Sequence, residues 1–392
     1  MHTKLLIVWM CSGILAYPNA VAQIWGCTDP LANNYNTTAT HNNGSCTYNA
    51  TSLSAAQSSS ISSTLYETSG LVWWNEKLWT HNDNTDLHLY GLDTTGNINT
   101  TYTLANTANY DWEEIAQDAD YLYVGDIGNN GNGNRTDLHI LRIAKNSLLL
   151  PIQDIDTIYF SYADQSNFSP AGANNTNYDC EAFIVTADSL YLFTKQWVSN
   201  GTAVYALPKM AGTHVAQLRQ TYNVQGLVTG ATYLPTQRVV VLLGYSPILQ
   251  PFCYLLYDFN GTNFFSGNRR KVSLNLPFHQ TEGITTINGL TYYLTNEYFS
   301  TFVTTPQKLH RFDFSGLLGN YIQSICQPAI TGVAEVCTDN IYTYNTALVS
   351  NAIYTWTISG NGTIISGQGT STLQVQWHNG TAGTVSVLRQ IP

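Results

Sequence analysis

The chain has 392 residues and a formal net charge of −10 at pH 7, which argues against nucleic acid or an anionic membrane surface as a partner. Only 10% of the residues are charged, while Asn, Thr, Ser, Gly and Tyr are abundant. This composition is typical of β-rich extracellular surfaces. The length is too great for one small domain and predicts two or three.

Residues 1–22 have the three parts of a secretory signal peptide. Lys4 precedes an apolar run from Leu5 to Leu15, and Ala20-Val21-Ala22 stands just before Gln23. A basic start, a short apolar stretch and a small-x-small end mark a cleaved leader. The apolar run is too short to span a bilayer. We therefore expect a secreted protein without a membrane span.

Residues 23–48 contain Gly-Cys-Thr-Asp-Pro at 26–30 and Gly-Ser-Cys at 44–46, with almost no apolar residues for a core. A bridge between Cys27 and Cys46 would have to hold such a segment. The segment resembles the Gly-Cys-Thr-Asp-Pro…Gly-Ser-Cys module of multidomain secreted bacterial proteins that a type IX pathway exports. Residues 49–63 are rich in Ser and Ala and are predicted to form a linker.

Residues 64–322 contain a degenerate repeat in which a polar residue opens an apolar strand, and a turn and a returning strand follow. Its first positions are 44, 68, 48 and 53 residues apart, the spacing of propeller blades with loop insertions. The five first positions are Ser69, Glu113, Glu181, Thr229 and Glu282. We expect an all-β fold, a five-bladed β-propeller. A sixth blade in the 68-residue interval and a β-sandwich are the alternatives.

The strands within each repeat alternate apolar and polar residues, and no stretch keeps a helical period. Returning strands are predicted at residues 77–80, 121–124, 189–192, 239–242 and 290–293. Third strands are predicted at residues 87–90, 138–141, 254–257 and 309–312.

The five first positions are polar in every repeat, and three of them are Glu. Because the first strand of each blade lines the central channel of a propeller, these side chains should converge on its axis. Three carboxylates at one level repel one another unless a cation neutralises them. Hard oxygen ligands from several directions suit Ca²⁺. Glu114 competes with Glu113 for the second position.

The first blade, Glu67-Thr68-Ser69-Gly70-Leu71-Val72 followed by Asn82-Asp83, resembles that of the calcium-activated nucleotidases, or soluble apyrases. Segments around Glu113, Thr229 and Glu282 resemble later blades of that family. The resemblance implies a five-bladed propeller whose central Ca²⁺ is held by Ser, Glu, Glu, Ser and Glu. This chain keeps that order, with Thr229 for the second Ser. The family's activity is hydrolysis of nucleotide phosphoanhydrides.

The ends of the second strands should form a ligand-face rim on the metal side. This rim would comprise His81, Asp83, Asp126, Lys195, Tyr245 and Glu297. Phosphate chemistry needs cations there, yet the family's Arg is Asn84 here and only Lys195 stands near a family basic position. We therefore expect an extracellular binding or adhesion scaffold for glycans or surface proteins. A calcium-dependent hydrolase is the alternative, so enzymatic activity stays open.

Residues 326–392 carry short alternating strands with Gly and Asn turns, including Tyr354-Thr355-Trp356 and Val375-Gln376-Trp377. They resemble the PKD-like, immunoglobulin-like sandwich of secreted and surface bacterial proteins, which implies a spacer or adhesion module. The absence of an export-sorting tail leaves open that the chain is a piece of a longer protein.

Six cysteines follow the leader, and none has the paired spacing of a zinc site, so we expect disulfides. Cys27–Cys46 is the local choice. Cys180 begins a channel strand and Cys253 follows a loop from the same face, so these two could bridge neighbouring blades. Cys326 and Cys337 then remain to pair across the junction with the sandwich.

Overall fold

The computed structural model describes residues 24–150, 152–301, 303–326, 330–346, 353–379 and 383–390. The predicted signal peptide, residues 1–22, lies outside the described residues. Strands account for 51% of the residues and helices for 5%, so the prediction of an all-β fold is confirmed. No helix in these ranges is long and apolar enough to cross a membrane.

Five groups of four strands make up the large β region. The first group is β5 (Thr68–Trp74), β6 (Lys77–Asn82), β7 (His88–Leu92) and β8 (Ile98–Thr103). The second is β9 (Trp112–Gln117), β10 (Tyr121–Asp126), β11 (His139–Ala144) and β12 (Ile155–Tyr162). The third is β13 (Asp179–Val185), β14 (Ser189–Lys195), β15 (Thr202–Pro208) and β16 (Gly212–Tyr222), and β16 pairs in parallel with β12, so that the second and third groups form one eight-stranded sheet. The fourth is β17 (Leu227–Leu234), β18 (Val239–Tyr245), β19 (Pro251–Tyr257) and β20 (Asn268–Leu274). The fifth is β21 (Thr281–Thr286), β22 (Thr291–Asn296), β25 (Lys308–Asp313) and the N-terminal β4 (Gln57–Ser60).

The first strands of the five groups, which we call the inner strands, contact one another in cyclic order. β5 contacts β9, β9 contacts β13, β13 contacts β17, β17 contacts β21, and β21 returns to β5. The arrangement is therefore nearly closed. Between residues 114 and 180 the described chain forms β10, β11, β12, a short 3-10 helix η2 (Lys145–Ser147) and loops, and no additional sheet.

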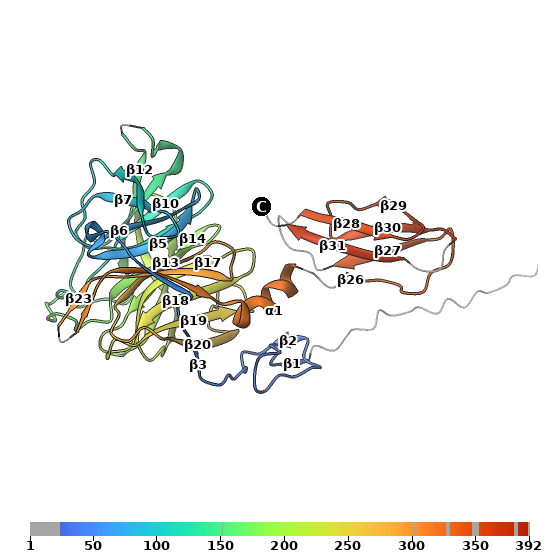
Figure 1. Ribbon diagram of the computed structural model, residues 1–392, viewed down its shortest axis with the longest axis horizontal. Helices are drawn as coiled ribbons and strands as arrows, with labels where there is room; N and C mark the ends of the chain where they lie inside the picture. Colours follow the sequence, from blue (N-terminus) through green and yellow to red (C-terminus); the bar gives the residue numbers. More distant parts are fainter. Residues whose placement is uncertain are drawn as a thin grey trace, which may run out of the picture.

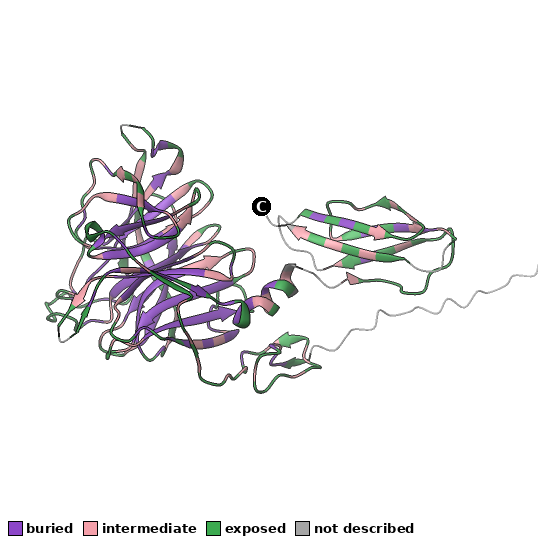
Figure 2. Cartoon of the chain, in the orientation of Figure 1, coloured by how far each residue is buried: buried purple, intermediate pink, exposed green. Residues whose placement is uncertain are grey.

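A separate hydrophobic cluster fills the space between each pair of neighbouring groups. Between the second and third groups, for example, Tyr123 and Ile140 pack with Phe183 and Leu192. The other four clusters join the first group to the second, the third to the fourth, the fourth to the fifth and the fifth to the first. The inner strands and their returning strands are consequently buried on both faces (Figure 2), which explains their nearly continuous apolar runs. Outer strands such as β8 and β16 are mostly exposed or half-buried.

The segment predicted as a linker, residues 49–63, instead forms strands within two sheets. β3 (Thr51–Leu53) pairs in parallel with β20, and β4 pairs antiparallel with β25. The following 3-10 helix η1 (Ser63–Leu65) buries Leu65. The linker prediction was wrong because a Ser-rich composition does not exclude strand pairing. Each of these short strands completes a sheet edge and draws its stability from its partner strand.

The N-terminal module holds only two short strands, β1 (Trp25–Gly26) and β2 (His41–Asn42), and the predicted Cys27–Cys46 disulfide is confirmed. The module bonds to the fourth group of strands. Asp29 accepts hydrogen bonds from Tyr48 at 2.7 Å and from Tyr257 at 2.5 Å. Thr28 donates to Asp258 at 2.8 Å. A segment with too few apolar residues for its own core thus uses the neighbouring sheet as its support.

A helix that the sequence did not predict, α1 (Ser315–Cys326), follows β25. It buries Leu317, Leu318 and Ile322 against the cluster between the fourth and fifth groups. Gly316 and Gly319 lower its helix propensity, which hid the periodicity. Packing of Leu318 and Ile322, four residues apart on one face, compensates for this.

The C-terminal strands form a second β body (Figure 1). One sheet contains β26 (Ile330–Thr331), β27 (Ile341–Thr346), β30 (Thr372–Trp377) and β29 (Gly362–Ser366). The other contains β28 (Ile353–Ser359) and β31 (Thr384–Gln390). Between β22 and β25 of the large region, a small separate hairpin is formed by β23 (Phe299–Ser300) and β24 (Thr304–Thr305). Tyr354, Trp356 and Trp377 fill the core between the two C-terminal sheets.

Two predicted disulfides are wrong. Cys180 and Cys253 are free, fully buried thiols. Cys180 belongs to the cluster between the second and third groups and Cys253 to that between the fourth and fifth, so neither reaches the other. Cys337 is a free, exposed thiol, which contradicts its bridge to Cys326, whose side chain lies outside the described residues. Both buried cysteines serve as small apolar residues.

Candidate functional site

Each of the five sequence-predicted first positions lies at a register shift near the start of an inner strand. In β13, Cys180 and Ala182 pair with successive residues of β14, so Glu181 between them has no partner. Glu113 and Thr229 are skipped in the same way. Glu282 is skipped together with Gly283, and Ser69 directly precedes the skip in β5. A β-bulge re-aims its side chain relative to the regular pleat. The bulges therefore give these five positions a common placement at one end of the ring.

The two hydroxyls of this set bridge neighbouring inner strands. Ser69 Oγ donates to the carbonyl of Glu113 at 2.7 Å, and Thr229 Oγ1 donates to the carbonyl of Thr281 at 2.5 Å. Both side chains are buried. Because each hydroxyl directs its proton at a carbonyl, its oxygen lone pairs remain available as acceptors.

The three carboxylates of the set are almost completely buried, with exposures of 4% for Glu113, 2% for Glu181 and 6% for Glu282. Burial raises the pKa of each carboxyl well above its usual range, and neighbouring acids raise it further. Glu282 Oε2 has no hydrogen-bond partner. An unpaired buried carboxylate oxygen is costly, so this atom marks an unmet demand for a cation or a donor.

Lys195, at the end of β14, supplies a positive charge to this cluster. Its ammonium lies 2.5 Å from Glu181 Oε2, and both side chains are buried. The same ammonium lies 4.7 Å from the ring centre of Trp197 and 5.2 Å from that of Tyr245. The prediction that Lys195 and Tyr245 stand at the metal-side end is consistent with these contacts, although neither faces solvent.

Two further acids, Asp111 and Asp179, belong to the cluster and were missed from the sequence. Burial raises the pKa of Asp111 to about 7, and Asp179 adds to this rise. Asp179 is fully buried and accepts hydrogen bonds from the Asn129 amide and the Trp197 indole. Each acid stands two residues before a ring Glu, as Asp111-Trp112-Glu113 and Asp179-Cys180-Glu181. The period-two alternation of a strand could have revealed them.

Two of the predicted rim residues, Asp83 and Glu297, interact with each other. Burial raises the pKa of Asp83 to about 8 and that of Glu297 to about 7, and for Asp83 the charge of Glu297 is the next cause. Gln280 donates to Glu297 Oε1 at 2.6 Å. These two rim residues therefore add further carboxyl groups beside Glu113, Glu181 and Glu282.

The other two predicted rim residues are directed elsewhere. Asp126 is fully buried and bonds Arg135 at 2.6 Å and the Tyr110 amide at 2.9 Å. His81 is fully buried beside Trp112, and burial lowers its pKa to about 4. Asp126 therefore supports the loops of this face rather than a ligand. His81 Nδ1 lies 3.2 Å from the Asn82 carbonyl, and its buried Nε2 has no hydrogen-bond partner.

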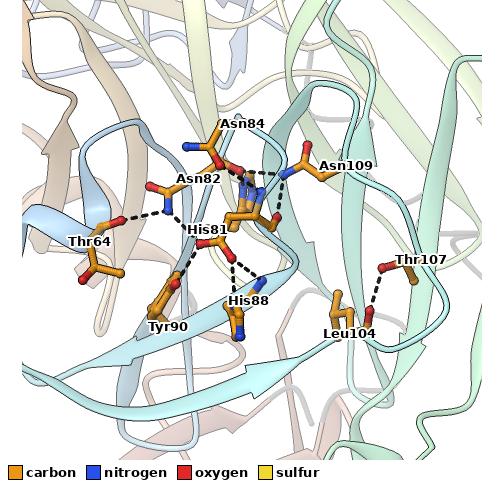
Figure 3. Close-up of polar contacts among 10 residues, drawn as sticks. Thr64, His81, Asn82, Asn84, His88, Tyr90, Leu104, Thr107 and Asn109 are labelled. Carbon is orange, nitrogen blue, oxygen red and sulfur yellow. Dashed lines mark hydrogen bonds and ion pairs between the residues drawn. The ribbon is translucent and has the colours of Figure 1, made fainter.

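The chain after β6 is fixed by an amide network next to His81 (Figure 3). Asn82 donates to the Thr64 carbonyl at 3.0 Å and to Asp86 at 2.9 Å. Asn109 donates to the carbonyls of Asn82 and Asp86. These bonds join the ends of the first and second groups, which holds Asp83 in place between them.

Gly128 lies directly against the acidic cluster. A methyl group at its Cα would come within 2.2 Å of Asp111 Oδ2 and 2.4 Å of Glu113 Oε1. The loop after β10 can approach these carboxylates only because the residue has no side chain.

Glu114, the competitor of Glu113, has a different role. It is fully buried and accepts a hydrogen bond at 2.7 Å from the amide of Ala231, 117 residues away on β17. It also accepts from the Ile115 amide at 3.0 Å. Because β9 and β17 are not neighbours in the ring, this carboxylate spans its interior.

A cavity of about 620 Å³ lies at the opposite ends of the inner strands. Each inner strand contributes to its lining, including Leu71, Ile115, Phe183, Ala231 and Thr285. Glu114 lies between this cavity and the five first positions. The lining of the cavity is mostly apolar.

The donor set of the five first positions suits a hard cation: two hydroxyl oxygens and three carboxylates, one of which has an oxygen without a partner. One of the carboxylates, Glu181, contacts the Lys195 ammonium. Within the described ranges, no three His, Cys, Asp or Glu side chains are grouped as metal ligands are.

Comparison with known proteins identifies the C-terminal body. Residues 324–390 match the PKD-like domain. This confirms the predicted resemblance of the C-terminal strands. No curated protein is similar enough in sequence to count as a relative.

Solved structures resemble the chain only distantly. A chain of the mitotic checkpoint complex shares 12% identity, with 62% of this chain and 60% of that one covered and a TM-score of 0.30. An exo-β-1,3-galactanase from Phanerochaete chrysosporium shares 9% identity, with 70% and 88% covered and a TM-score of 0.33. A putative 6-phosphogluconolactonase from Bacteroides uniformis shares 8%, with 72% and 79% covered and a TM-score of 0.31. At these scores the similarities do not bear on function.

Proposed function

We propose that residues 57–322 form a five-bladed β-propeller with a central calcium site, and that the protein serves as an extracellular binding or adhesion scaffold. The cyclic contacts of the five inner strands support the blade count. So do the five hydrophobic clusters, one between each pair of successive groups. Each blade would contain four strands, with β4 completing the fifth.

The observation that carries the calcium proposal is the buried, unpaired Glu282 Oε2 among the other first-position oxygens. Glu113, Glu181 and Glu282 would hold the ion through carboxylates, and Ser69 and Thr229 through hydroxyl oxygens. A bound Ca²⁺ would supply two positive charges where buried acids repel one another. The ring would then be held by one ion that all five blades share.

The extracellular assignment rests on three features. A PKD-like domain at residues 324–390 and the Cys27–Cys46 disulfide fit an extracellular protein. The leader-like residues 1–22 are consistent with secretion. Glycans or surface proteins are therefore the proposed class of partner, and the PKD-like domain would act as a spacer or second adhesive module.

The charge around the proposed site argues against phosphoanhydride hydrolysis. Asp83, Asp111, Asp179 and Glu297 surround the three ring glutamates, and Lys195 is already paired with Glu181. A polyphosphate needs preorganised cations in its transition state. The scaffold is thus favoured over the hydrolase.

Thermal melting with and without calcium tests the metal site. A ligand at 100 times its dissociation constant adds about 2.7 kcal/mol to the free energy of unfolding, so CaCl₂ should raise the melting temperature relative to chelator. Glu282→Gln should shrink this rise by at least half. Glu76→Gln, on the exposed turn after β5, is the matched control and should keep it. Identical wild-type curves in both conditions would refute the calcium proposal.

Two assays separate the scaffold from the hydrolase. Phosphate release from nucleoside di- and triphosphates should stay at background in millimolar CaCl₂. Rapid release that disappears in Glu113→Gln would overturn the scaffold in favour of the enzyme. Binding to a glycan array or to intact cell surfaces should require Ca²⁺, and binding that persists in chelator would separate adhesion from the metal.

A further inference from the structure

Lys195 is buried in the centre of the carboxylate cluster. Its side chain is 4% exposed and its ammonium lies 2.5 Å from Glu181 Oε2. Besides Glu181, its charge acts on Glu282, Asp179, Glu297 and Asp111. One ammonium therefore serves as a shared counter-ion for several acids.

Aromatic rings position this ammonium. Trp197 and Tyr245 place their ring centres 4.7 and 5.2 Å from Nζ, which is cation–π distance. The Trp197 indole N–H also donates to Asp179 at 2.7 Å. The long, flexible Lys stem allows the ammonium to change partners, which the rigid fork of Arg would hinder.

We propose that the Lys195 ammonium and a divalent cation are alternative occupants of the carboxylate ring, so that Ca²⁺ binds by displacing Lys195 from Glu181. This rests on the calcium site proposed above, because Glu181 is one of its ligands. A carboxylate that lies against the ammonium cannot also face the ion without bringing two positive charges close together in a medium of low polarity. The metal-free ring in turn keeps a cation that limits the repulsion among its acids.

The exchange has a consequence for affinity. Each Ca²⁺ that binds must also break a buried ion pair, which lowers the apparent affinity of an otherwise favourable oxygen set. Extracellular calcium modules typically have dissociation constants of about 10⁻⁴–10⁻³ M. Lys195 would hold this site in that range, so that it fills only at extracellular calcium concentrations.

Calorimetric titration of the full chain with CaCl₂ tests the exchange, using wild type, Lys195→Met and a matched control. Lys209→Met is the control because it removes the same charge from a Lys–Asp pair of 2.7 Å at the other end of the inner strands. Lys195→Met should bind Ca²⁺ at least ten-fold more tightly than wild type. In chelator it should also melt at a lower temperature. Lys209→Met should bind as wild type does.

The outcomes of this titration separate the two proposals. If wild type binds Ca²⁺ and folded Lys195→Met binds equally or more weakly, the exchange is refuted and the calcium site stands. If only Lys195→Met binds, the calcium site of the native chain and the exchange in the native chain are both refuted, because Lys195 then excludes the ion. If neither binds, both proposals fail.

A second measurement does not depend on the folding of Lys195→Met. Departure of the ammonium from Trp197 should change the indole emission when wild type is titrated with CaCl₂. The change should be absent from Trp197→Phe, which reports any contribution from the other tryptophans. Calcium binding by calorimetry without a Trp197-dependent change in emission would overturn the exchange.

Discussion

The two ends of the inner strands differ sharply, although the same five strands form both. At the first end, bulges interrupt the pairing and bring carboxylates and hydroxyls together. At the second end, pairing is regular and the side chains line a mostly apolar cavity of about 620 Å³. Regular pairing alternates side chains between the sheet faces, where they pack against neighbouring groups. One extra residue per inner strand, relative to its partner strand, is enough to build a polar site on the same scaffold.

Glu114 separates these two ends. It bonds only backbone amides among the described atoms, including that of Ala231 across the ring. The acidic end should therefore respond to cations and pH, while the packing of apolar side chains such as Phe183 at the other end should respond to neither. Substitutions at the two ends should consequently have separable effects.

The largest effect is expected from Phe183→Ala at the apolar end. Phe183 is fully buried in the cluster between the second and third groups. Truncating such a ring typically costs about 3–5 kcal/mol of unfolding free energy. Chemical denaturation should show this loss equally in CaCl₂ and in chelator, and equally at pH 6 and pH 8. Phe168→Ala, at an exposed site, is the control. A loss that depends on calcium would show that the two ends are coupled.

A smaller loss is expected from Gly128→Ala at the acidic end. The new methyl group would collide with Asp111 and Glu113, and overpacking typically costs about 1–3 kcal/mol. The same change should weaken the calcium-induced rise in melting temperature. Gly131→Ala lies in the same loop with open space around it and should alter neither quantity. Equal behaviour of the two variants would refute the close packing of Gly128 against the carboxylates.

The last prediction is a pH dependence of the metal-free protein. Folding raises the pKa of Asp83 to about 8 and those of Asp111 and Glu297 to about 7. Between about pH 5 and pH 8 the folded chain therefore holds more protons than the unfolded chain. Its free energy of unfolding should fall as pH rises through this window. Melting in chelator should show that slope, and Asp83→Asn should flatten it.

The control for the pH slope is Asp188→Asn, an exposed position near the apolar cavity. It should keep the slope of the wild type. A metal-free protein equally stable at pH 6 and pH 8 would contradict the clustering of these acids.

Much of the large β region was predictable from the sequence. Apolar runs with turns between them indicated the inner and returning strands because burial on both faces leaves a strong signal. Weakly apolar strands such as β3 and β4 left none, since their partners on β20 and β25 are more than 200 residues away. The helix α1 was not predictable for a similar reason. Its packing against residues distant in the sequence compensates for the low helix propensity of its two glycines.

The site was partly predictable. The repeat placed Ser69, Glu113, Glu181, Thr229 and Glu282 at equivalent positions, and all five lie at register shifts. The sequence could not show that Lys195 pairs with Glu181, because that contact depends on two neighbouring strands and a bulge. Nor could it show that Asp126 forms an ion pair with Arg135, because the two stand nine residues apart along an irregular loop whose path the sequence does not predict.

The pairing of β4 with β25 makes the order of synthesis matter. Ser58 bonds His310 across 252 residues, so the last group of strands cannot be completed until nearly the whole region has been made. Closing so long a loop is entropically costly, and contacts of such sequence separation slow folding. Until closure, β25 presents an unpaired edge, which is a site for association between chains. A chain that ends before residue 308 is left with its N-terminal strand unmatched, so completeness of the polypeptide becomes a condition for a closed and soluble fold.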